Sequence, residues 1–418
     1  MVTMIIDSRR ESPFFSRNYG GFTLDQQQYY QQMVQCNERV TILDPMAGQG
    51  FLLSDQIYLD QNIILGDLNV AAILLANLRK PEFLTDSEKF LRIAFDYLTK
   101  FEGKECYQNR NTVYCDNMLS EPTYNFLQEY RYSLSKLSGV EIETTNDFWQ
   151  LPDTIKFLFS LPILASRSMC NFRLSDNTTW IIPGSLIRYT DPVEEIKKTL
   201  LMWNDYAKSK NTTSQIGHMA TYFLDAGNYE DYLLLPRFDH IITSPPYANR
   251  MDYSRVWLPE LTILSAISDF NIEKYKRKTI GSNIVKDRPY YELSGLNTQT
   301  QAELDQIKND GYHGSSSYYY PYFKQYALEL NNTLVQMCRM LEQSGKVVLF
   351  VRDTRRKEVL LSVKNIVDNV LINQLSFSVV DQRMKIINSH AGKKQAKKSK
   401  SSLFGDAQRE WWLCYERR

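Results

Sequence analysis

The sequence has few of the residues that build metal centres and disulfide frameworks. Only 4 histidines and 6 cysteines occur among its 418 residues. The cysteines are widely separated and none lies in a CxxC pair, so neither a zinc site nor a disulfide scaffold is expected. We interpret the cysteines as buried thiols in a reducing cytoplasm.

Long hydrophobic runs are also missing. The longest apolar stretch, residues 157–165, is interrupted by Ser160 and Pro162, which excludes a segment that spans a bilayer. The first residues lack the basic region and the long apolar region of a secretory signal. We therefore expect a cytoplasmic protein that has no membrane partner.

The net charge of the chain is close to zero. Lys and Arg number 49 and Asp and Glu number 48, which gives a formal charge of +1. This balance excludes a protein that binds polyanions through its overall charge, so any nucleic-acid surface must be a local patch. The composition is otherwise that of a globular protein. Because a single core stops growing near about 250–300 residues, a compact unit with a large insert is expected.

The start of the chain has the pattern of a doubly wound α/β sheet. A β-prone run at 40–43 is followed by a glycine-containing turn at 44–50 and then by a helix. A second β-prone run at 63–66 ends at Asp67 and precedes a helical stretch at 70–79. Strand, glycine turn, helix, strand and acid is the order that opens such a sheet.

The rest of the chain predicts a long insertion. About 150 residues separate this opening from the next chemically marked strand, 238–242, whereas a βαβ unit needs about 30. We predict a first part of the core at 1–84, an inserted lobe and candidate target-recognition region at 85–215, and the second part of the core at 216–418. In the last part we expect a helix at 322–343 that ends at Gly345, a strand at 346–351, a helix at 357–370, and a closing pair of strands at 376–380 and 410–415.

The turn at 44–50, Asp-Pro-Met-Ala-Gly-Gln-Gly, indicates the first ligand. Its glycines let the backbone approach a ligand closely, but the third glycine of a dinucleotide motif is missing and Asp44 would repel a phosphate. Asp44 could instead receive an ammonium group, and Asp67 is placed for ribose hydroxyls. S-adenosylmethionine has a ribose and a cationic amino-acid end and no phosphate, so it is the predicted cofactor. The alternative is an ordinary strand–turn–helix with a capping Asp44.

A second motif, Thr-Ser-Pro-Pro-Tyr at 243–247, follows the strand expected at 238–242. Its prolines fix φ and donate no N–H. The Ser244 hydroxyl and the Pro245 carbonyl can accept hydrogen bonds from a nucleobase amine, and Tyr247 can stack on the base. Two such acceptors would aim the nitrogen lone pair at a methyl sulfonium, once the base is flipped out of its stack. The alternative is a proline-rich loop that happens to contain a tyrosine.

These motifs resemble the DNA amino-methyltransferases, specifically the N4-cytosine type that Thr-Ser-Pro-Pro-Tyr marks. The resemblance is specific over 40–90 and 215–265, weaker over 340–418, and assigns nothing within 85–215. It implies a Rossmann-like methyltransferase sheet and S-adenosylmethionine-dependent methylation of a flipped cytosine at N4. The substrate implied is a specific sequence of double-stranded DNA, in a bacterial or archaeal restriction-modification or related defence system. A cognate restriction endonuclease and a location at the nucleoid are part of that expectation.

The resemblance also implies the site residues. The catalytic set is Ser244, Pro245, Pro246 and Tyr247. The cofactor-binding set is Asp44, Pro45, Ala47, Gly48, Gly50, Phe51, Asp67, Leu68, Asn69, Asp225, Ala226 and Thr243. Asp116 is an alternative to Asp225 as the adenine-contacting acid, and we prefer Asp225 because it directly precedes the catalytic strand. Met46 and Gln49 depart from the family's usual residues, and the insert lies before the adenine-contacting acid, which leaves open which lobe reads the target.

Cations and aromatic residues outside these motifs are candidates for contact with DNA. The predicted DNA-binding residues are Asn249, Arg250, Tyr253, Arg255, Lys276, Arg277, Lys393, Lys394, Lys397 and Lys398. Surface salt bridges are the alternative near residue 250, and a solvated tether is the alternative for the lysine-rich loop at 393–400. The tyrosine run at 318–320 is interpreted as packing.

Three alternative functions stay open at this point. N6-adenine methylation of DNA uses the same amine geometry and is the closest. RNA base methylation is disfavoured because no RNA-binding module is recognisable. A binding-only subunit would keep the methyltransferase fold without its chemistry, and the intact residues 244–247 argue against it.

Overall fold

A computed structural model describes most of the chain. The described residues are 22–34, 38–50, 52, 61–102, 113–114, 117–142, 147–175, 180–184, 190–210, 217–248, 251–285, 295–387 and 408–418. All structural statements below refer to these residues.

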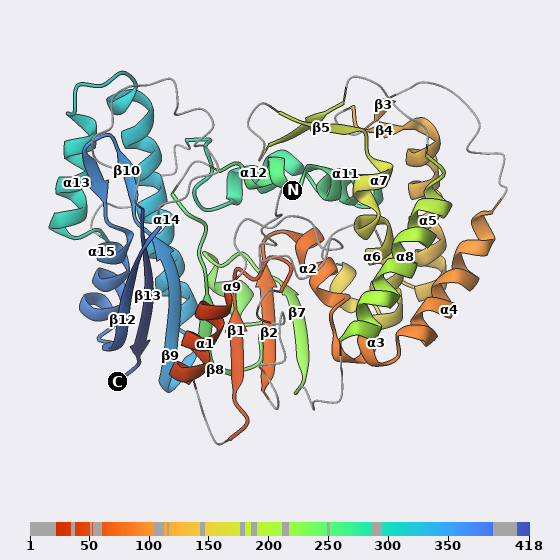
Figure 1. The fold of residues 1–418 in the computed structure, drawn as a ribbon, viewed down its shortest axis with the longest axis horizontal. Coiled ribbons are helices and arrows are strands. Elements are labelled where there is room, and N and C mark those ends of the chain that lie inside the picture. Colours follow the sequence, from red (N-terminus) through yellow and green to blue (C-terminus); the bar gives the residue numbers. More distant parts are fainter. Residues whose placement is uncertain are drawn as a thin grey trace, which may run out of the picture. The chain divides into compact units, whose positions relative to one another are not determined.

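Seven strands form the main sheet, in the order β12-β13-β9-β8-β1-β2-β7 (Figure 1). Their bounds are β1 Thr41–Asp44, β2 Asn62–Asp67, β7 Met219–Phe223, β8 Phe238–Thr243, β9 Leu341–Arg352, β12 Ser378–Ile387 and β13 Gln408–Glu416. β8 is parallel to both β1 and β9, β2 is parallel to β7, and β13 is antiparallel to both of its neighbours.

The strand order identifies the ligand-binding edge of this sheet. From β1 the chain proceeds to β2 and β7 on one side and later to β8 and β9 on the other. This is the doubly wound α/β topology, so the predicted Rossmann-like fold class is confirmed. In such sheets ligands bind beyond the carboxyl ends of the strands where the order reverses, which here lies between β1 and β8.

Helices and short hairpins make up the rest. The α-helices are α1 Leu24–Val34, α2 Val70–Asn77, α3 Pro81–Thr85, α4 Ser87–Leu98, α5 Glu121–Ser138, α6 Asp153–Leu164, α7 Ser166–Met169, α8 Pro192–Ser209, α9 Tyr229–Tyr232, α10 Tyr253–Val256, α11 Leu258–Ile267, α12 Ile272–Lys278, α13 Thr298–Lys308, α14 Tyr320–Cys338 and α15 Val363–Asp368. The short strand pairs are β3 Val113–Tyr114 with β4 Leu119–Ser120, β5 Phe172–Leu174 with β6 Ile181–Pro183, and β10 Thr354–Arg356 with β11 Val359–Leu361. Two π-helical turns cover Ser315–Tyr319 and Asn369–Gln374, and two 3-10 turns cover Thr99–Phe101 and Asp147–Gln150.

Contacts divide the chain into two compact units. The first holds the described residues of Ala47–Phe223 and Tyr253–Tyr275 together with Phe22 and Thr23. Every residue of α2 is buried, and the helix packs against β2, β7 and α6. Phe83, Phe90 and Phe157 form a ring cluster with centroid separations of 4.6–5.3 Å. This core therefore includes residues from both sides of residue 84. The three-part functional division stays a prediction.

The second unit holds Leu24–Met46, Leu224–Asp252 and Lys276–Arg418. The centre of β9 is fully buried, as its run of β-branched and large apolar residues favours. Tyr29 of α1 packs its ring against Trp412 of β13, with a centroid separation of 5.5 Å, and donates its hydroxyl to the Trp412 carbonyl. The predicted closing strands are confirmed as the antiparallel pair β12 and β13, and both are longer than expected.

The predicted helix end at Gly345 is wrong. α14 ends at Cys338, and Gly345 lies within β9. It occupies a register irregularity between β8 and β9, where an added Cβ would lie 2.6 Å from the carbonyl oxygen of Asp239. This glycine permits two backbones to approach closely.

The predicted helix at 357–370 begins too early. Residues 354–361 form the β10–β11 hairpin, with Lys357 at φ +50° in its turn, and α15 starts only at Val363. Ser362 caps this helix by accepting a hydrogen bond from the Asn365 N–H. The run Val359-Leu360-Leu361 is too short to distinguish a strand from a helix by its periodicity.

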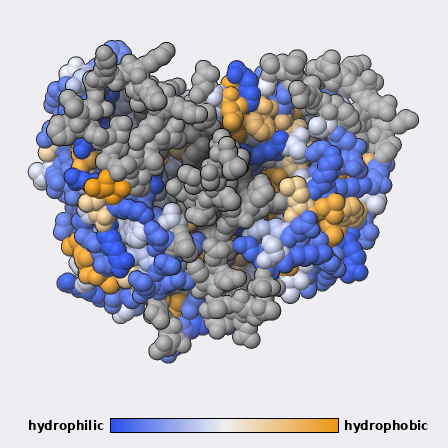
Figure 2. All heavy atoms as spheres, viewed as in Figure 1, coloured by the Kyte–Doolittle hydropathy of each residue, from blue (hydrophilic) through white to orange (hydrophobic). Residues whose placement is uncertain are grey.

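Figure 2 shows one face of the molecule. Among the described residues of that face, hydrophilic side chains predominate and hydrophobic ones form small separate patches. Within the described part of the chain, no helix combines the length and apolarity needed to cross a membrane.

Candidate functional site

The carboxyl ends of β1 and β8 meet at a buried hydrogen bond. The Thr243 hydroxyl donates to Asp44 Oδ1 at 2.7 Å, and the Met46 N–H donates to the same oxygen at 3.1 Å. Both side chains are buried, so these donors fix the orientation of the Asp44 carboxylate. Parallel pairing of β1 with β8 brings together two residues 199 positions apart in the sequence.

The turn after β1 is fastened to the end of β2 within the first unit. Ala47 N–H donates to the Gly66 carbonyl at 2.9 Å, and Gly48 N–H donates to Asp67 Oδ2 at 2.8 Å. Asn69 N–H donates to the other Asp67 oxygen at 2.7 Å. Gly48 has φ +53°, and an added Cβ would meet no atom within 4 Å. The backbone next to the Asp67 carboxylate therefore borders open space.

The Asp67 carboxyl is electrostatically unusual. Burial raises its pKa to about 6, and the hydrogen bonds from Asn69 and Gly48 oppose part of that rise. Each carboxylate oxygen that accepts one N–H retains capacity for a further donor. The arrangement suits a ligand that brings hydroxyl groups to this acid.

Arg79 supports the turn and was missed by the sequence analysis. Its guanidinium donates to the carbonyls of Gln49 at 3.2 Å and Gly50 at 3.0 Å, and the side chain is buried. The sequence offered one sign of this role, because Arg79 is a single arginine at the end of an otherwise apolar helical stretch. Asn69, predicted to bind cofactor, accepts a hydrogen bond from the Ala72 N–H and caps α2. Pro45 is buried and Leu68 is half-buried.

The loop at 244–247 is held by β9 of the second unit. Ser244 Oγ has two acceptors for its one proton, the carbonyl oxygen of Phe350 at 3.1 Å and the Tyr247 hydroxyl oxygen at 3.4 Å. A hydroxyl has one proton and two lone pairs, so this donation leaves Ser244 an acceptor towards any further group. Pro245 is buried, while Pro246 and Tyr247 are half-buried.

Tyr247 is held from one side by a cation that the sequence analysis did not find. The Arg352 guanidinium lies 4.6 Å from the Tyr247 ring centroid. Arg352 in turn donates from Nε and Nη2 to Glu410 Oε2 at 2.8 and 2.6 Å. Because Glu410 is only 4% exposed, this ion pair holds the guanidinium against the ring.

Asp225 lies in a compact turn. Its Oδ1 accepts the Gly227 N–H at 3.2 Å, and its own N–H donates to Asp231 Oδ2 at 2.7 Å. Lys278 Nζ lies 3.9 Å from Asp225 Oδ2, and the Ala226 carbonyl accepts the Tyr232 hydroxyl at 3.1 Å. Burial raises the pKa of Asp231. The turn is rigidly built, and its contact with an adenine stays a prediction.

The predicted DNA-binding residues fall into two groups. Tyr253 and Arg255 are half-buried on α10, Arg277 is on α12, and Lys276 pairs with buried Asp252 at 3.0 Å. Lys276 is only 18% exposed at its side chain, so this ion pair gives it a structural role whatever else it contacts. The following predicted residues lie outside the described part of the chain: Phe51, Asp116, Asn249, Arg250, Lys393, Lys394, Lys397 and Lys398.

His240 belongs to the core, as expected from its place on the strand. It is buried, its Nδ1 accepts the Lys346 N–H at 3.1 Å, and burial lowers its pKa. The neutral imidazole of His240 links β8 to the backbone of β9, so its role is structural.

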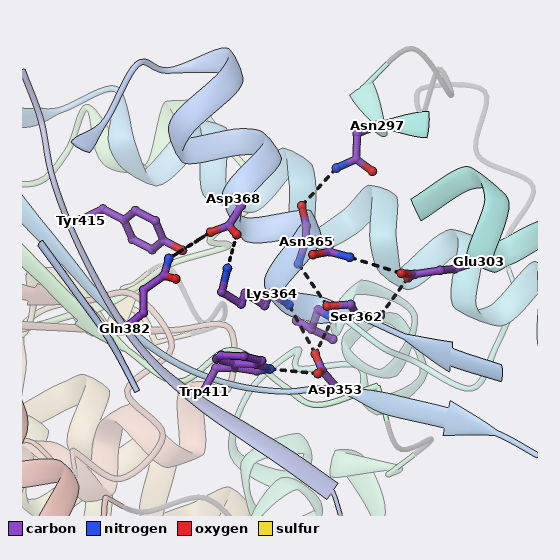
Figure 3. A network of polar contacts seen from close by, with 11 residues as sticks. Asn297, Glu303, Asp353, Ser362, Lys364, Asn365, Asp368, Gln382, Trp411 and Tyr415 are labelled. Atoms are coloured by element: carbon purple, nitrogen blue, oxygen red, sulfur yellow. Dashed lines mark hydrogen bonds and ion pairs between the residues drawn. The ribbon is translucent and has the colours of Figure 1, made fainter. Parts of the chain in front are cut away.

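A polar network fixes the end of β9 (Figure 3). Asp353 accepts the Trp411 indole N–H at 2.9 Å and the Val363 N–H at the start of α15 at 2.9 Å. Glu303 of α13 accepts the Ser362 N–H at 2.9 Å. Burial raises the pKa of both carboxyls, while their N–H donors favour the ionised form. These hydrogen bonds fix the position of the chain at Asp353, where it leaves β9.

Comparison with known proteins assigns no family to this chain. No protein-family model matches the chain, and no curated protein matches it in sequence. Two solved structures of the rRNA methyltransferase AviRa from Streptomyces viridochromogenes are 10% and 11% identical, with TM-scores of 0.31 and 0.30. Each comparison covers 98% of this chain. It covers 93% of the AviRa chain in the first structure and 92% in the second. A likeness of this size is too weak to bear on activity or substrate.

Proposed function

We propose that the chain methylates the N4 amine of a cytosine flipped out of a specific double-stranded DNA sequence, in a restriction-modification or related defence system. The observation that carries this proposal is the hydrogen bonding of Ser244. Because its one proton is donated within the protein, to the Phe350 carbonyl or to the Tyr247 hydroxyl, its oxygen is left to accept from an amine, beside a tyrosine ring that Arg352 holds in place.

The chemistry of the residues fits S-adenosylmethionine as methyl donor. Asp67 would accept the ribose hydroxyls, the open backbone at Gly48 leaves room for a ligand, and Asp44 would face the amino-acid end. No glycine-rich phosphate cradle is needed, since this donor carries no phosphate. When bound, the donor supplies an electrophilic methyl group on a sulfonium.

The residues of the catalytic loop would act by positioning. The Ser244 oxygen and the Pro245 carbonyl would accept the two amine hydrogens, and Tyr247 would stack on the base. The N–CH₃ bond forms as the S–CH₃ bond breaks, S-adenosylhomocysteine leaves, and one amine proton passes to water. Alignment supplies the acceleration, so no titrating histidine is required.

Mapping of modified bases tests the proposal. The gene is expressed in a host that lacks DNA modification, with Ser244→Ala as the matched control of low activity, and the genomic DNA is read by single-molecule sequencing. N4-methylcytosine at a fixed motif, strongly reduced in the control, is the expected result. N6-methyladenine at a fixed motif would replace cytosine by adenine as the target. Unmodified DNA together with labelled-methyl transfer to RNA would refute a DNA substrate.

The raised pKa of Asp67 predicts a pH dependence of donor binding. Ribose hydroxyls bind the carboxylate better than the carboxylic acid, so the donor complex favours the ionised form. With a pKa of about 6 in the free protein, affinity should be constant above about pH 7 and fall by up to about tenfold per unit below pH 6. Calorimetric titration with S-adenosylmethionine between pH 5 and 8, at intervals of about half a unit, measures it.

Two variants complete this test. Asp67→Asn should weaken binding by about tenfold to a hundredfold at neutral pH and give a flat profile. Asp86→Asn, an exposed acid of the same unit, should leave the profile unchanged. A flat profile in the wild type would contradict the ribose role of Asp67.

A further inference from the structure

The β10–β11 hairpin is attached directly to the catalytic loop. It begins two residues after the end of β9, at the edge of the sheet where ligands bind. The hydroxyl of Thr354, its first residue, donates to the carbonyl of Ala248 at 2.9 Å, and this bond is buried. Because Ala248 follows Tyr247, the hairpin and the catalytic loop form one assembly within the second unit.

The hairpin carries three consecutive cations, Arg355 and Arg356 on β10 and Lys357 in the turn, where Glu358 follows. Arg355 and Lys357 are exposed. Among the residues that the structure describes, no carboxylate lies within ion-pair distance of these three side chains. Within that part of the chain, none of the three is held in an ion pair, unlike Arg352 and Lys364 on either side.

Aromatic rings, rather than acids, hold two of these cations. The Arg356 guanidinium lies 3.8 Å from the Tyr319 ring centroid, and Lys357 Nζ lies 5.0 Å from the Tyr312 ring centroid. A ring face orients a cation but does not cancel its charge, so the positive potential persists. Tyr312 is 47% exposed, which leaves part of its surface for a ligand.

The tyrosines are held in place by local structure. Gly311 and Gly314 have φ of +74° and +77°, and a π-helical turn at Ser315–Tyr319 follows. Asp310 accepts the Tyr312 N–H at 2.9 Å, and the Arg356 guanidinium donates to the His313 carbonyl at 3.0 Å. A hydrogen bond from Ser315, together with the charges of Arg356 and Lys357, lowers the pKa of Asp310, so this acid offsets part of the charge of Arg356 and Lys357 but not that of Arg355. α13 packs against both β11 and the π-helical turn. The cluster is a built surface, and π-helical turns are frequent at functional sites.

We propose that Arg355, Lys357 and Tyr312 form a surface that binds the sugar-phosphate backbone of nucleic acid next to the target base. The proposal rests on the function proposed above. Two exposed cations would contact phosphates, and the exposed tyrosine would contact a sugar or base face. A local cluster of this kind also suits a protein whose net charge of +1 gives no general attraction to DNA.

The salt dependence of DNA binding tests this surface. The full chain is titrated with a duplex that contains the motif found by sequencing, at several salt concentrations. Arg355→Ala/Lys357→Ala should reduce the slope of log K against log salt by about 1.8, which corresponds to two lost phosphate contacts, and weaken binding at least about tenfold near 0.15 M salt. Arg355→Lys/Lys357→Arg should keep the slope of the wild type.

A matched control removes the same charge from the other edge of the sheet. Arg237 and Arg339 precede β8 and β9, at their amino-terminal ends. Arg237→Ala/Arg339→Ala should leave the slope unchanged. Affinity for S-adenosylmethionine reports that each variant is folded.

The outcomes separate this proposal from the function on which it rests. If the wild type methylates DNA and Arg355→Ala/Lys357→Ala keeps its slope, the surface is wrong and the function stands. An equal loss of slope in the control pair also overturns the surface, because the effect is then one of overall charge. If the wild type neither binds nor methylates DNA, both proposals fail.

Discussion

Replacement of Ser244 by alanine should slow single-turnover methyl transfer by about a hundredfold or more. The variant loses the oxygen that accepts from the target amine, and its methyl group cannot replace the hydrogen bond to the Phe350 carbonyl. Misplacement of a reacting atom by about 1 Å can cost about a hundredfold in rate. Ser244 belongs to neither the turn at 44–50 nor the β10–β11 hairpin. The affinities for S-adenosylmethionine and for DNA should therefore change by less than about threefold.

Rapid-quench measurement with labelled S-adenosylmethionine gives the single-turnover rate of this variant. Ser265→Ala is the matched control, since that hydroxyl only donates to the Leu261 carbonyl of its own helix. A wild-type rate in Ser244→Ala would remove Ser244 from the mechanism. A rate loss matched by an equal loss of donor affinity would instead indicate a general disturbance of the site.

The parts of the site that the sequence predicts are those in which chemistry follows a strand directly. Asp44, Asp67 and the loop at 244–247 each end a β-prone run, and the alternation of strands and helices places such ends at one edge of a sheet. The bond between Asp44 and Thr243 follows from that topology once β1 pairs with β8. The fold class was predictable for the same reason.

The supports of the site were not predictable because they connect distant parts of the chain. Arg352 contacts the ring of Tyr247. Glu410 accepts hydrogen bonds from Arg352 and from Gln26 of α1. Neither periodicity nor spacing signals such contacts. The β10–β11 hairpin was missed because its strands have three residues each, and Gly345 was misread because the signal of a helix end resembles that of a close strand approach.

Loss of the Glu410 carboxylate should have the largest effect on stability. Its Oε2 accepts both donors of Arg352, and its Oε1 accepts from Gln26 at 3.1 Å and from Trp412 at 3.0 Å. Glu410→Ala leaves all of these donors without their acceptor. Breaking a buried ion pair by removing one partner costs about 3–5 kcal/mol. Since the Arg352 side chain is 28% exposed, we expect about 3 kcal/mol from urea unfolding.

Glu410→Gln separates this structural role from an effect on catalysis. The amide keeps one acceptor oxygen, so the loss of stability should be smaller, about 1–2 kcal/mol, while the charge that holds Arg352 against Tyr247 is gone. If Glu410 acts on the reaction through Arg352 and Tyr247, the variant should transfer methyl about tenfold more slowly at unchanged donor affinity. In a Tyr247→Ala background the same substitution should have almost no further effect on the rate, although it still destabilises the fold. Equal slowing in both backgrounds would mean that the ion pair stabilises the protein without positioning the ring, because coupling between two residues appears only where one acts through the other.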